Sequence, residues 1–317
     1  MNSIDLPVYM ERTYRAESEL GFGGSGIVYK AWHLRLHKYV VIKEDRYGSI
    51  NDIEVRRNEI DALKNVKSAH LPQVFDFLTE GSSTFTVIEF VDGESFGKLL
   101  RRGQRFAQSQ IVKWYKQLAS ALEVIHKQDI CHRDIKPANI MLTPEGNVCL
   151  IDFNAALIGE KSPRFISRSP GYASPEQNHI FQWFENVCKE RQKLRDPGAG
   201  MILSGDMRTE LPECDSITAC TGGTQWPPSG AKLVPHFSQT PVYGIDWKRS
   251  DIYSLGATMY HLLTGERPSE RADEVIALSR FGEFSEDIVY VIERSMRRNP
   301  SERFASVEEL AMAVRGL

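Results

Sequence analysis

The sequence predicts an α+β protein with a small β-rich N-terminal lobe, which carries one long helix, and a larger, mainly helical C-terminal lobe. Short β-branched segments alternate with turns and a single amphipathic helix over residues 12–90. From residue 94 onward the apolar residues follow helical spacing. The 317 residues suffice for two such lobes with a sizeable core, after an N-terminal extension over 1–11.

A glycine-rich turn joins the first two predicted strands. Gly21, Gly23 and Gly26 form a G-x-G-x-x-G pattern, which Val28 follows. Dinucleotide-binding folds use similar glycines but place a helix directly after them. Here residues 27–32 are β-branched and aromatic, which predicts a strand instead. A glycine turn between strands can cover phosphate because no Cβ keeps the backbone away.

The next strand, 39–43, ends in Lys43, and a helix is predicted over 51–66. Glu59 lies beside the apolar stripe of that helix, where an unpaired carboxylate would be costly. A lone lysine at a strand end is more commonly solvated. The glycine turn before it and the acid after it favour a Lys43–Glu59 ion pair.

The remaining elements follow in order. Strands are predicted over 73–78 and 84–90, a linker between the lobes over 89–93, and a strand over 147–151. A helix before residue 126 is marked by an apolar stripe of Ile111, Trp114, Tyr115, Leu118, Ala121, Leu122 and Ile125.

Residues 131–139, with Asp152 beyond them, combine two acids, an amide and a lysine. Asp134 can take a proton from an attacking alcohol, and Lys136 can neutralise charge on a moving phosphoryl group. Asn139 and Asp152 can offer oxygen ligands to Mg²⁺. This set predicts phosphoryl transfer.

Together these segments resemble the motifs of eukaryotic-like (Hanks-type) serine/threonine protein kinases, and in their compact build a bacterial member. Ser174-Pro175-Glu176 resembles the A-P-E motif, 251–256 the start of the buried central helix, and 299–304 the late segment whose arginine pairs with that glutamate. The resemblance covers about 12–315, apart from one insertion. It implies a bilobal protein kinase fold over 12–317, with an N-lobe to 90, a hinge over 89–93 and a C-lobe over 94–317. It also implies a Glu176–Arg303 pair and an Asp251 that braces the catalytic loop.

The resemblance implies transfer of the ATP γ-phosphoryl group to Ser or Thr of proteins, with Mg²⁺ or, as the alternative ion, Mn²⁺. Asp134, Lys136, Lys43 and Glu59 would be catalytic, and Asn139 and Asp152 would hold the metal. The residues implied to bind the nucleotide are Leu20, Gly21, Gly23, Gly26, Val28, Val41, Lys43, Ile88, Glu89, Val91 and Met141.

Three departures from the family pattern leave alternatives open. Asn154 stands where the metal motif usually has glycine, Val41 replaces an alanine above adenine, and Ser174 replaces the alanine of A-P-E. A nucleotide-binding pseudokinase acting as a scaffold is therefore one alternative. A small-molecule kinase is another, which Lys136-Pro137 and Ser174-Pro175-Glu176 disfavour.

Arg133 suggests regulation, because an arginine beside the catalytic aspartate often pairs with a phosphorylated residue. Ser162 and Ser167 are the candidate phosphosites, whereas Ser169 aligns with a hydroxyl of the substrate-docking loop.

Composition limits partners and compartment. The net charge of −3 argues against nucleic acid, and no apolar run approaches the roughly 20 residues of a membrane span. The first residues lack the features of a signal peptide. Five scattered cysteines do not resemble a disulfide framework, so a reducing cytoplasm is expected.

An insertion is predicted over about 178–243. Its start, 178–195, has the apolar spacing of a helix, and its remainder is rich in Gly, Pro, Ser and Thr. Cys188, Cys214, Cys220 and His236 lack the paired spacing of a zinc site, so free thiols are the simpler interpretation. Because the insertion follows the docking segment, it is a candidate site for a protein substrate or partner.

Deletion of residues 200–240 should therefore reduce phosphorylation of a true protein substrate more than that of a short peptide. The measurement is the initial rate on each acceptor. Equal rates for the deleted and full chains on both acceptors would contradict a docking role.

Overall fold

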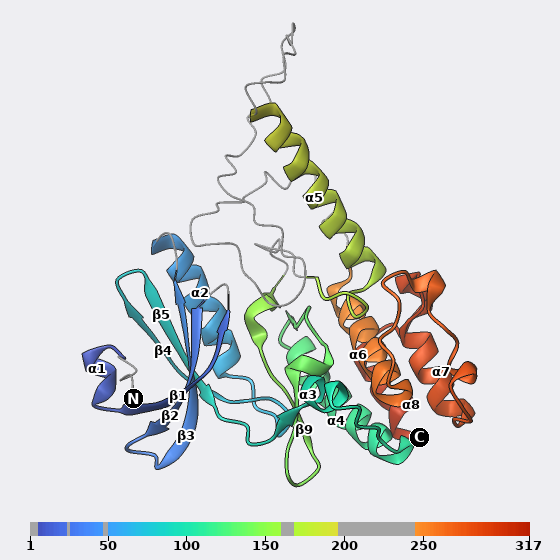
Figure 1. Ribbon diagram of the computed structural model, residues 1–317, viewed down its shortest axis with the longest axis horizontal. Coiled ribbons are helices and arrows are strands. Elements are labelled where there is room, and N and C mark those ends of the chain that lie inside the picture. Colours follow the sequence, from blue (N-terminus) through green and yellow to red (C-terminus); the bar gives the residue numbers. More distant parts are fainter. Residues whose placement is uncertain (1–5, 24–25, 47–49, 160–167, 196–244) are drawn as a thin grey trace, which may run out of the picture.

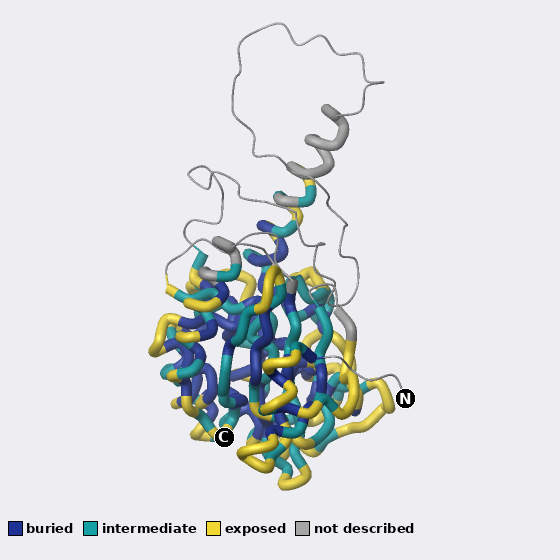
Figure 2. The backbone as a smooth tube through the Cα atoms, turned by 90° about the vertical axis from the view of Figure 1, so that its left-hand side faces the viewer, coloured by how far each residue is buried: buried dark blue, intermediate teal, exposed yellow. Residues whose placement is uncertain are grey.

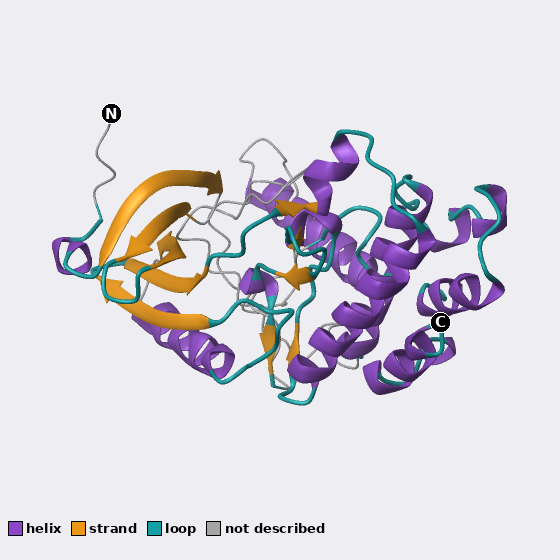
Figure 3. Ribbon diagram, turned by 90° about the horizontal axis from the view of Figure 1, so that it is seen from below, coloured by secondary structure: helices purple, strands orange, loops and turns teal. Residues whose placement is uncertain are grey.

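The computed structural model describes residues 6–23, 26–46, 50–159, 168–195 and 245–317. A β-sheet lies at one end of the molecule and helices fill the other (Figures 1 and 3). This is the predicted α+β, two-lobed architecture.

The N-lobe sheet is antiparallel and has the strand order β1-β2-β3-β5-β4. Its strands are β1 (Tyr14–Gly23), β2 (Gly26–His33), β3 (Lys38–Arg46), β4 (Val74–Glu80) and β5 (Ser83–Glu89). β-Branched and aromatic residues favour these strands, because such side chains pack well on a pleated surface. The four predicted strands that follow the glycine turn are each present within a few residues of their expected bounds.

Two helices complete this lobe. Helix α2 (Ile50–Lys64) lies between β3 and β4 in sequence, and its Ile60 and Leu63 are buried in a core that continues into the C-lobe. Helix α1 (Val8–Glu11) places Met10, together with Leu6, in the core beneath the sheet. The lobe therefore begins before residue 12, and residues 6–11 are part of it.

The C-lobe is built on α4 (Gln108–His126) and α6 (Trp247–Thr264). All seven residues of the predicted stripe on α4 are buried. Helix α6 begins where Asp246 accepts a hydrogen bond from the Arg249 amide, and ends at Gly265 in the left-handed conformation. The other helices are α3 (Phe96–Arg101), α7 (Glu286–Ser295) and α8 (Val307–Arg315). None of the described helices has the length and apolar character needed to cross a membrane.

Short strands position the loops between the lobes. β6 (Glu94–Ser95), β8 (Ile140–Leu142) and β9 (Val148–Leu150) form one small sheet, and β7 (Ile130–Cys131) pairs with β10 (Leu157–Ile158) in another. The segment 132–139 thus leaves β7 and enters β8 after the 3-10 turn η1 (Pro137–Asn139). Asp152 follows β9 and precedes a second 3-10 turn, η2 (Phe153–Ala155).

Helix α5 (Pro175–Arg195) projects from the C-lobe (Figure 1). It confirms the predicted helix over 178–195 but begins three residues earlier, because proline is well suited to the first turn of a helix. Its first turns are packed, with Gln177 and Ile180 both buried. Buried segments otherwise concentrate in the interior of the molecule (Figure 2). The remainder of the insertion, including Cys214, Cys220 and His236, lies outside the described residues, as does the side chain of Cys188.

Glu176 and Arg303 form the predicted ion pair. The two guanidinium NH groups donate to the two carboxylate oxygens at 2.7 and 2.8 Å. The Arg303 side chain is fully buried, and its remaining hydrogen bonds go to the carbonyl oxygens of Arg297, Arg298 and Arg249. The pair joins the start of α5 to the chain before α8.

The Glu176→Ala variant should be destabilised by about 3–5 kcal/mol, because it leaves a buried guanidinium without its carboxylate. Denaturant unfolding of the C-lobe measures this. The control is Asp129→Asn, which tolerates the left-handed φ of this position, removes the charge that pairs with Lys248 at the same 2.7 Å distance on the surface, and should barely move the midpoint. Equal midpoint shifts for the two variants would contradict the structural role of the Glu176–Arg303 pair.

Candidate active site

One buried carboxylate, that of Asp251, holds the start of the loop 132–139. Asp251 Oδ1 accepts the amide of Arg133 at 2.8 Å, and Oδ2 accepts the amide of His132 at 2.8 Å. His126 Nε2 lies 2.9 Å from the same Oδ2 and fixes the carboxylate from α4. Arg133 has a left-handed φ of 61°, which is unfavourable for a residue with a Cβ and is maintained by these hydrogen bonds. The predicted bracing role of Asp251 is confirmed.

Asp134, Lys136, Asn139 and Ser169 meet at the open side of this loop. Asp134 Oδ1 accepts a hydrogen bond from Ser169 Oγ at 2.6 Å. Its Oδ2 accepts from Asn139 Nδ2 at 3.0 Å and pairs with Lys136 Nζ at 2.9 Å. Lys136 Nζ also donates to Ser169 Oγ at 3.0 Å. A hydroxyl group therefore already lies between the carboxylate and the ammonium.

Asp152 faces this cluster from the end of β9. It has a left-handed φ of 71°, and its Oδ1 accepts from Lys43 Nζ at 2.7 Å. His132 Nε2 contacts the Ile151 carbonyl oxygen at 3.1 Å, and the Phe153 ring packs edge-on against the His132 ring. These contacts fix the backbone on both sides of Asp152 relative to the loop.

Oxygen donors suitable for a divalent cation come from two residues. Asn139 uses its Nδ2 for the Asp134 carbonyl oxygen and carboxylate, and no described residue donates to its Oδ1. Asp152 contributes a carboxylate. Hard oxygen ligands of this kind suit Mg²⁺ and Mn²⁺, so the donor set fits the ion that the sequence predicts.

Burial and neighbouring charges shift the pKa of the Asp152 carboxyl in opposite directions. Burial by itself raises the pKa of its carboxyl, but the adjacent Lys43 ammonium, His132 and Lys136 outweigh it and hold the pKa below the ordinary value. Asp152 is therefore ionised at neutral pH. Burial lowers the pKa of Arg133 to about 10 and lowers that of His132, so the imidazole is neutral.

The predicted ion pair between Lys43 and Glu59 is absent from this structure. Lys43 binds Asp152 instead, and Glu59 Oε2 accepts from Arg56 Nη1 at 3.2 Å. Arg56 Nη2 also donates to Asn154 Oδ1 at 3.3 Å. The reason is local: Arg56 lies one helical turn before Glu59 on the same face of α2, so it reaches the carboxylate without any tertiary movement.

The residues predicted to surround the nucleotide lie on five strands, β1, β2, β3, β5 and β8, and on the hinge. Val41 pairs with Ile88 across β3 and β5, and Met141 lies on β8. Leu20 is exposed on β1. Their enclosure of adenine, together with the contacts of Val28, Glu89 and Val91, remains a prediction.

Two glycines are required by close backbone approach. A Cβ on Gly26 would lie 1.6 Å from the Glu44 carbonyl oxygen, and one on Gly93, at the end of the hinge, would lie 2.1 Å from that of Leu142. Gly21 has open space around its Cα, as a phosphate-covering turn needs. The tip of the turn at residues 24–25 lies outside the described residues.

Arg133 does not extend into solvent in this structure. It is buried, its Nε donates to the Ala155 carbonyl oxygen at 2.7 Å, and its guanidinium lies over the Trp247 ring. Its predicted partners Ser162 and Ser167 lie outside the described residues. Phosphate binding by Arg133 remains a prediction.

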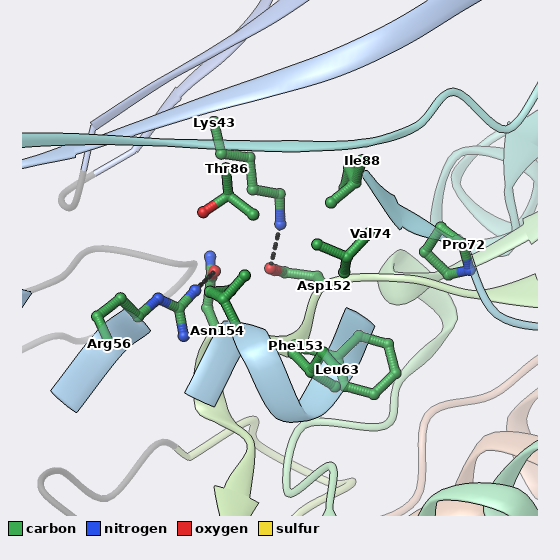
Figure 4. A pocket seen from close by; sticks show the side chains of 11 residues that line it. Lys43, Arg56, Leu63, Pro72, Val74, Thr86, Ile88, Asp152, Phe153 and Asn154 are labelled. Atoms are coloured by element: carbon green, nitrogen blue, oxygen red, sulfur yellow. Dashed lines mark hydrogen bonds and ion pairs between the residues drawn. The ribbon is translucent and has the colours of Figure 1, made fainter. Parts of the chain in front are cut away.

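Arg56 is the site residue that sequence reasoning missed. It lines a pocket with Lys43, Asp152 and Asn154, between α2 and the sheet (Figure 4). Its signal was its position three residues before Glu59, combined with a side chain at 154 where the family pattern has glycine.

Comparison with known proteins agrees with this geometry. The model of the protein kinase domain family matches residues 14–179, just over half of the chain. The chain belongs to the protein kinase domain family. The match ends where the predicted insertion begins.

Bacterial serine/threonine-protein kinases are among the similar proteins. A probable serine/threonine-protein kinase of Clostridium acetobutylicum is 31% identical over 175 residues, 53% of this chain and 27% of that protein. The serine/threonine-protein kinase pkn3 of Myxococcus xanthus is 31% identical over 197 residues, 56% of this chain and 36% of that protein. PknA of Corynebacterium glutamicum is 26% identical over 322 residues, 95% of this chain and 55% of that protein. The chain thus spans about a quarter to about half of the length of these relatives. The family implies ATP as a substrate and a divalent metal ion.

The Lys43→Met variant should raise the pKa of Asp152, because burial would then act without the ammonium that offsets it. Carboxyl ¹³C chemical shifts recorded against pH measure this. In the parent chain the stabilisation from this lowered pKa is present above the unfolded pKa of Asp152 and is lost as the pH falls through the folded value. Lys30→Met is the control, since the Lys30 ammonium lies over the Tyr39 ring. An unchanged titration of Asp152 in Lys43→Met would contradict the assignment.

Proposed function

We propose that this chain is an ATP-dependent serine/threonine protein kinase, which transfers the γ-phosphoryl group to Ser or Thr hydroxyls of protein substrates. The observation that carries the proposal is the Ser169 hydroxyl, 2.6 Å from Asp134 Oδ1 and 3.0 Å from Lys136 Nζ. This contact supports the proposal, because it places an alcohol between a carboxylate and an ammonium group.

In the proposed reaction Asp134 orients the substrate hydroxyl and accepts its proton as the oxygen attacks the γ-phosphorus. The bond from that phosphorus to the bridging oxygen breaks, and ADP leaves with the electron pair. Lys136 stabilises negative charge on the γ-phosphate, and Lys43 contacts the α- and β-phosphates. Ser169 positions Asp134 and Lys136 relative to each other.

Asn139 and Asp152 would hold Mg²⁺, with Mn²⁺ as the alternative. The ion supplies charge neutralisation on the phosphate oxygens. Glu59 is proposed to support Lys43 in the nucleotide-bound state. The glycine turn of Gly21, Gly23 and Gly26 covers the phosphates, and the hinge from Glu89 to Val91 contacts adenine through its backbone.

Partners and compartment follow from simpler features. The proposed partners are proteins, docked in part by the insertion over 178–243, rather than nucleic acid, in keeping with the net charge of −3. The buried cysteines Cys131 and Cys149 are free thiols, which supports a cytoplasmic location.

Asp134→Ala should lower the rate of phosphoryl transfer by about 10²–10⁴-fold or more, because it removes the base while leaving the nucleotide groups in place. Labelled ATP with Mg²⁺ and a generic protein acceptor, followed by phosphosite mapping, measures transfer, and calorimetry measures ATP binding. Asp129→Ala is the control, an exposed aspartate just before β7, and should retain the full rate.

Label on Ser or Thr in the parent chain alone supports the proposal. Transfer retained in Asp134→Ala would remove the role of Asp134. ATP binding without any transfer in the parent chain would favour the pseudokinase alternative, and transfer only to small alcohols would favour a small-molecule kinase.

A further inference from the structure

Two cations, Lys43 and Arg56, and their carboxylate partners, Asp152 and Glu59, lie at or beside the pocket between α2 and the N-lobe sheet. Lys43 reaches Asp152 from β3, and Arg56 reaches Asn154 from α2 on another side of the same pocket (Figure 4). The side chains of Lys43 and Arg56 are only 15% and 10% exposed. Each cation has a carboxylate, Asp152 for Lys43 and Glu59 for Arg56. These two ion pairs matter because an unpaired buried charge is costly.

Binding of a nucleotide with its metal ion would change the partner of Lys43. A divalent cation held by Asp152 would compete with Lys43 for this carboxylate, and the Lys43 ammonium would then be available to the phosphates. The carboxylate that the family resemblance pairs with Lys43 is Glu59 on α2, and Arg56 already holds it. Because Glu59 Oε2 already accepts from Arg56, Lys43 and Arg56 would compete for this carboxylate.

Asn154 strengthens the contact between Arg56 and Glu59. Its Oδ1 accepts from Arg56 Nη2 while Nη1 donates to Glu59, so the planar guanidinium is fixed between the segment after Asp152 and α2. A glycine at 154 could not provide this acceptor. The residue that departs from the family pattern is thus the one that anchors Arg56.

We propose that Arg56 and Asn154 form a latch, which holds Glu59 away from Lys43 and must be released when the metal–nucleotide complex binds. Arg56 and Asn154 are positioning residues in this scheme, since they act through Glu59. The inference rests on the nucleotide site of the proposed function. The latch therefore weakens the binding of the nucleotide when Mg²⁺ accompanies it, and has no effect on binding without Mg²⁺.

Calorimetric binding of ADP, with and without Mg²⁺, tests the latch. Arg56→Met keeps most of the aliphatic stem and removes the guanidinium, so it should tighten Mg²⁺–ADP binding by about three- to tenfold, as expected for the loss of one competing ion pair. Binding of ADP without Mg²⁺ should be unchanged, because Asp152 then retains Lys43. Arg56→Lys, which keeps the charge, should restore weaker binding.

A double-mutant cycle separates the latch from a structural effect. In the Glu59→Gln background, Arg56→Met should no longer change Mg²⁺–ADP affinity, because the competition for the carboxylate is gone. Asn154→Gly should tighten binding in the same direction by a smaller factor, and it decides the question if Arg56→Met does not fold.

Unchanged or weaker Mg²⁺–ADP binding in folded Arg56→Met, or an equal gain in the Glu59→Gln background, would overturn the latch. If the parent chain binds no Mg²⁺–ADP at all, the proposed function itself fails. The two failures are therefore distinguishable.

Discussion

The arrangement of the site depends on a single buried carboxylate. Asp251, on α6, accepts two consecutive backbone amides of the loop after β7 and is itself fixed by His126 of α4. Amides that point the same way at one carboxylate require an unusual backbone, and Arg133 adopts it with a left-handed φ. The positions of Asp134, Lys136 and Asn139 follow from this anchor, because all three lie within six residues of the anchored Arg133 along the chain. Two helices of the C-lobe core are thus coupled directly to the chemistry.

A second level of organisation is electrostatic. The loop residues Asp134, Lys136 and Asn139 contact one another within one short segment, whereas Lys43, Glu59 and Asp152 come from three separate elements. Their pairing depends on where α2 lies relative to β3 and β9, and small movements can exchange partners. In the structure Lys43 is paired with Asp152, and Glu59 with Arg56. The N-lobe side of the site therefore depends on contacts between separate elements, while the C-lobe side is a single loop held by Asp251.

Most of the fold was predictable because its signals are local. Helix α4 has a continuous apolar stripe, and the strand after the glycine turn begins with β-branched and aromatic residues. The Glu176–Arg303 pair and the bracing by Asp251 followed from resemblance rather than from periodicity. The packing of residues 6–11 on the N-lobe was not predicted, because Leu6 and Met10 are isolated apolar residues whose burial depends on the sheet. The start of α5 was placed late, since Pro175 and Glu176 were assigned to a motif rather than to a helix.

The sequence by itself determined which chemical groups are available: the acids, amide and lysine of the loop, the glycine turn, and a lysine and a glutamate at suitable separation. Local spacing fixes the neighbours of Asp134, because a tight loop brings residues two and five positions apart into contact. The partner of Lys43 was decided only by the tertiary structure. Glu59 and Asp152 are both acids within reach of a long side chain, and the choice depends on the position of α2. In the structure Arg56, three residues before Glu59 on the same helix, pairs with that carboxylate, and Asn154, 98 residues away in sequence, accepts from the same guanidinium. A buried guanidinium needs acceptors where it lies, so these contacts depend on the tertiary structure.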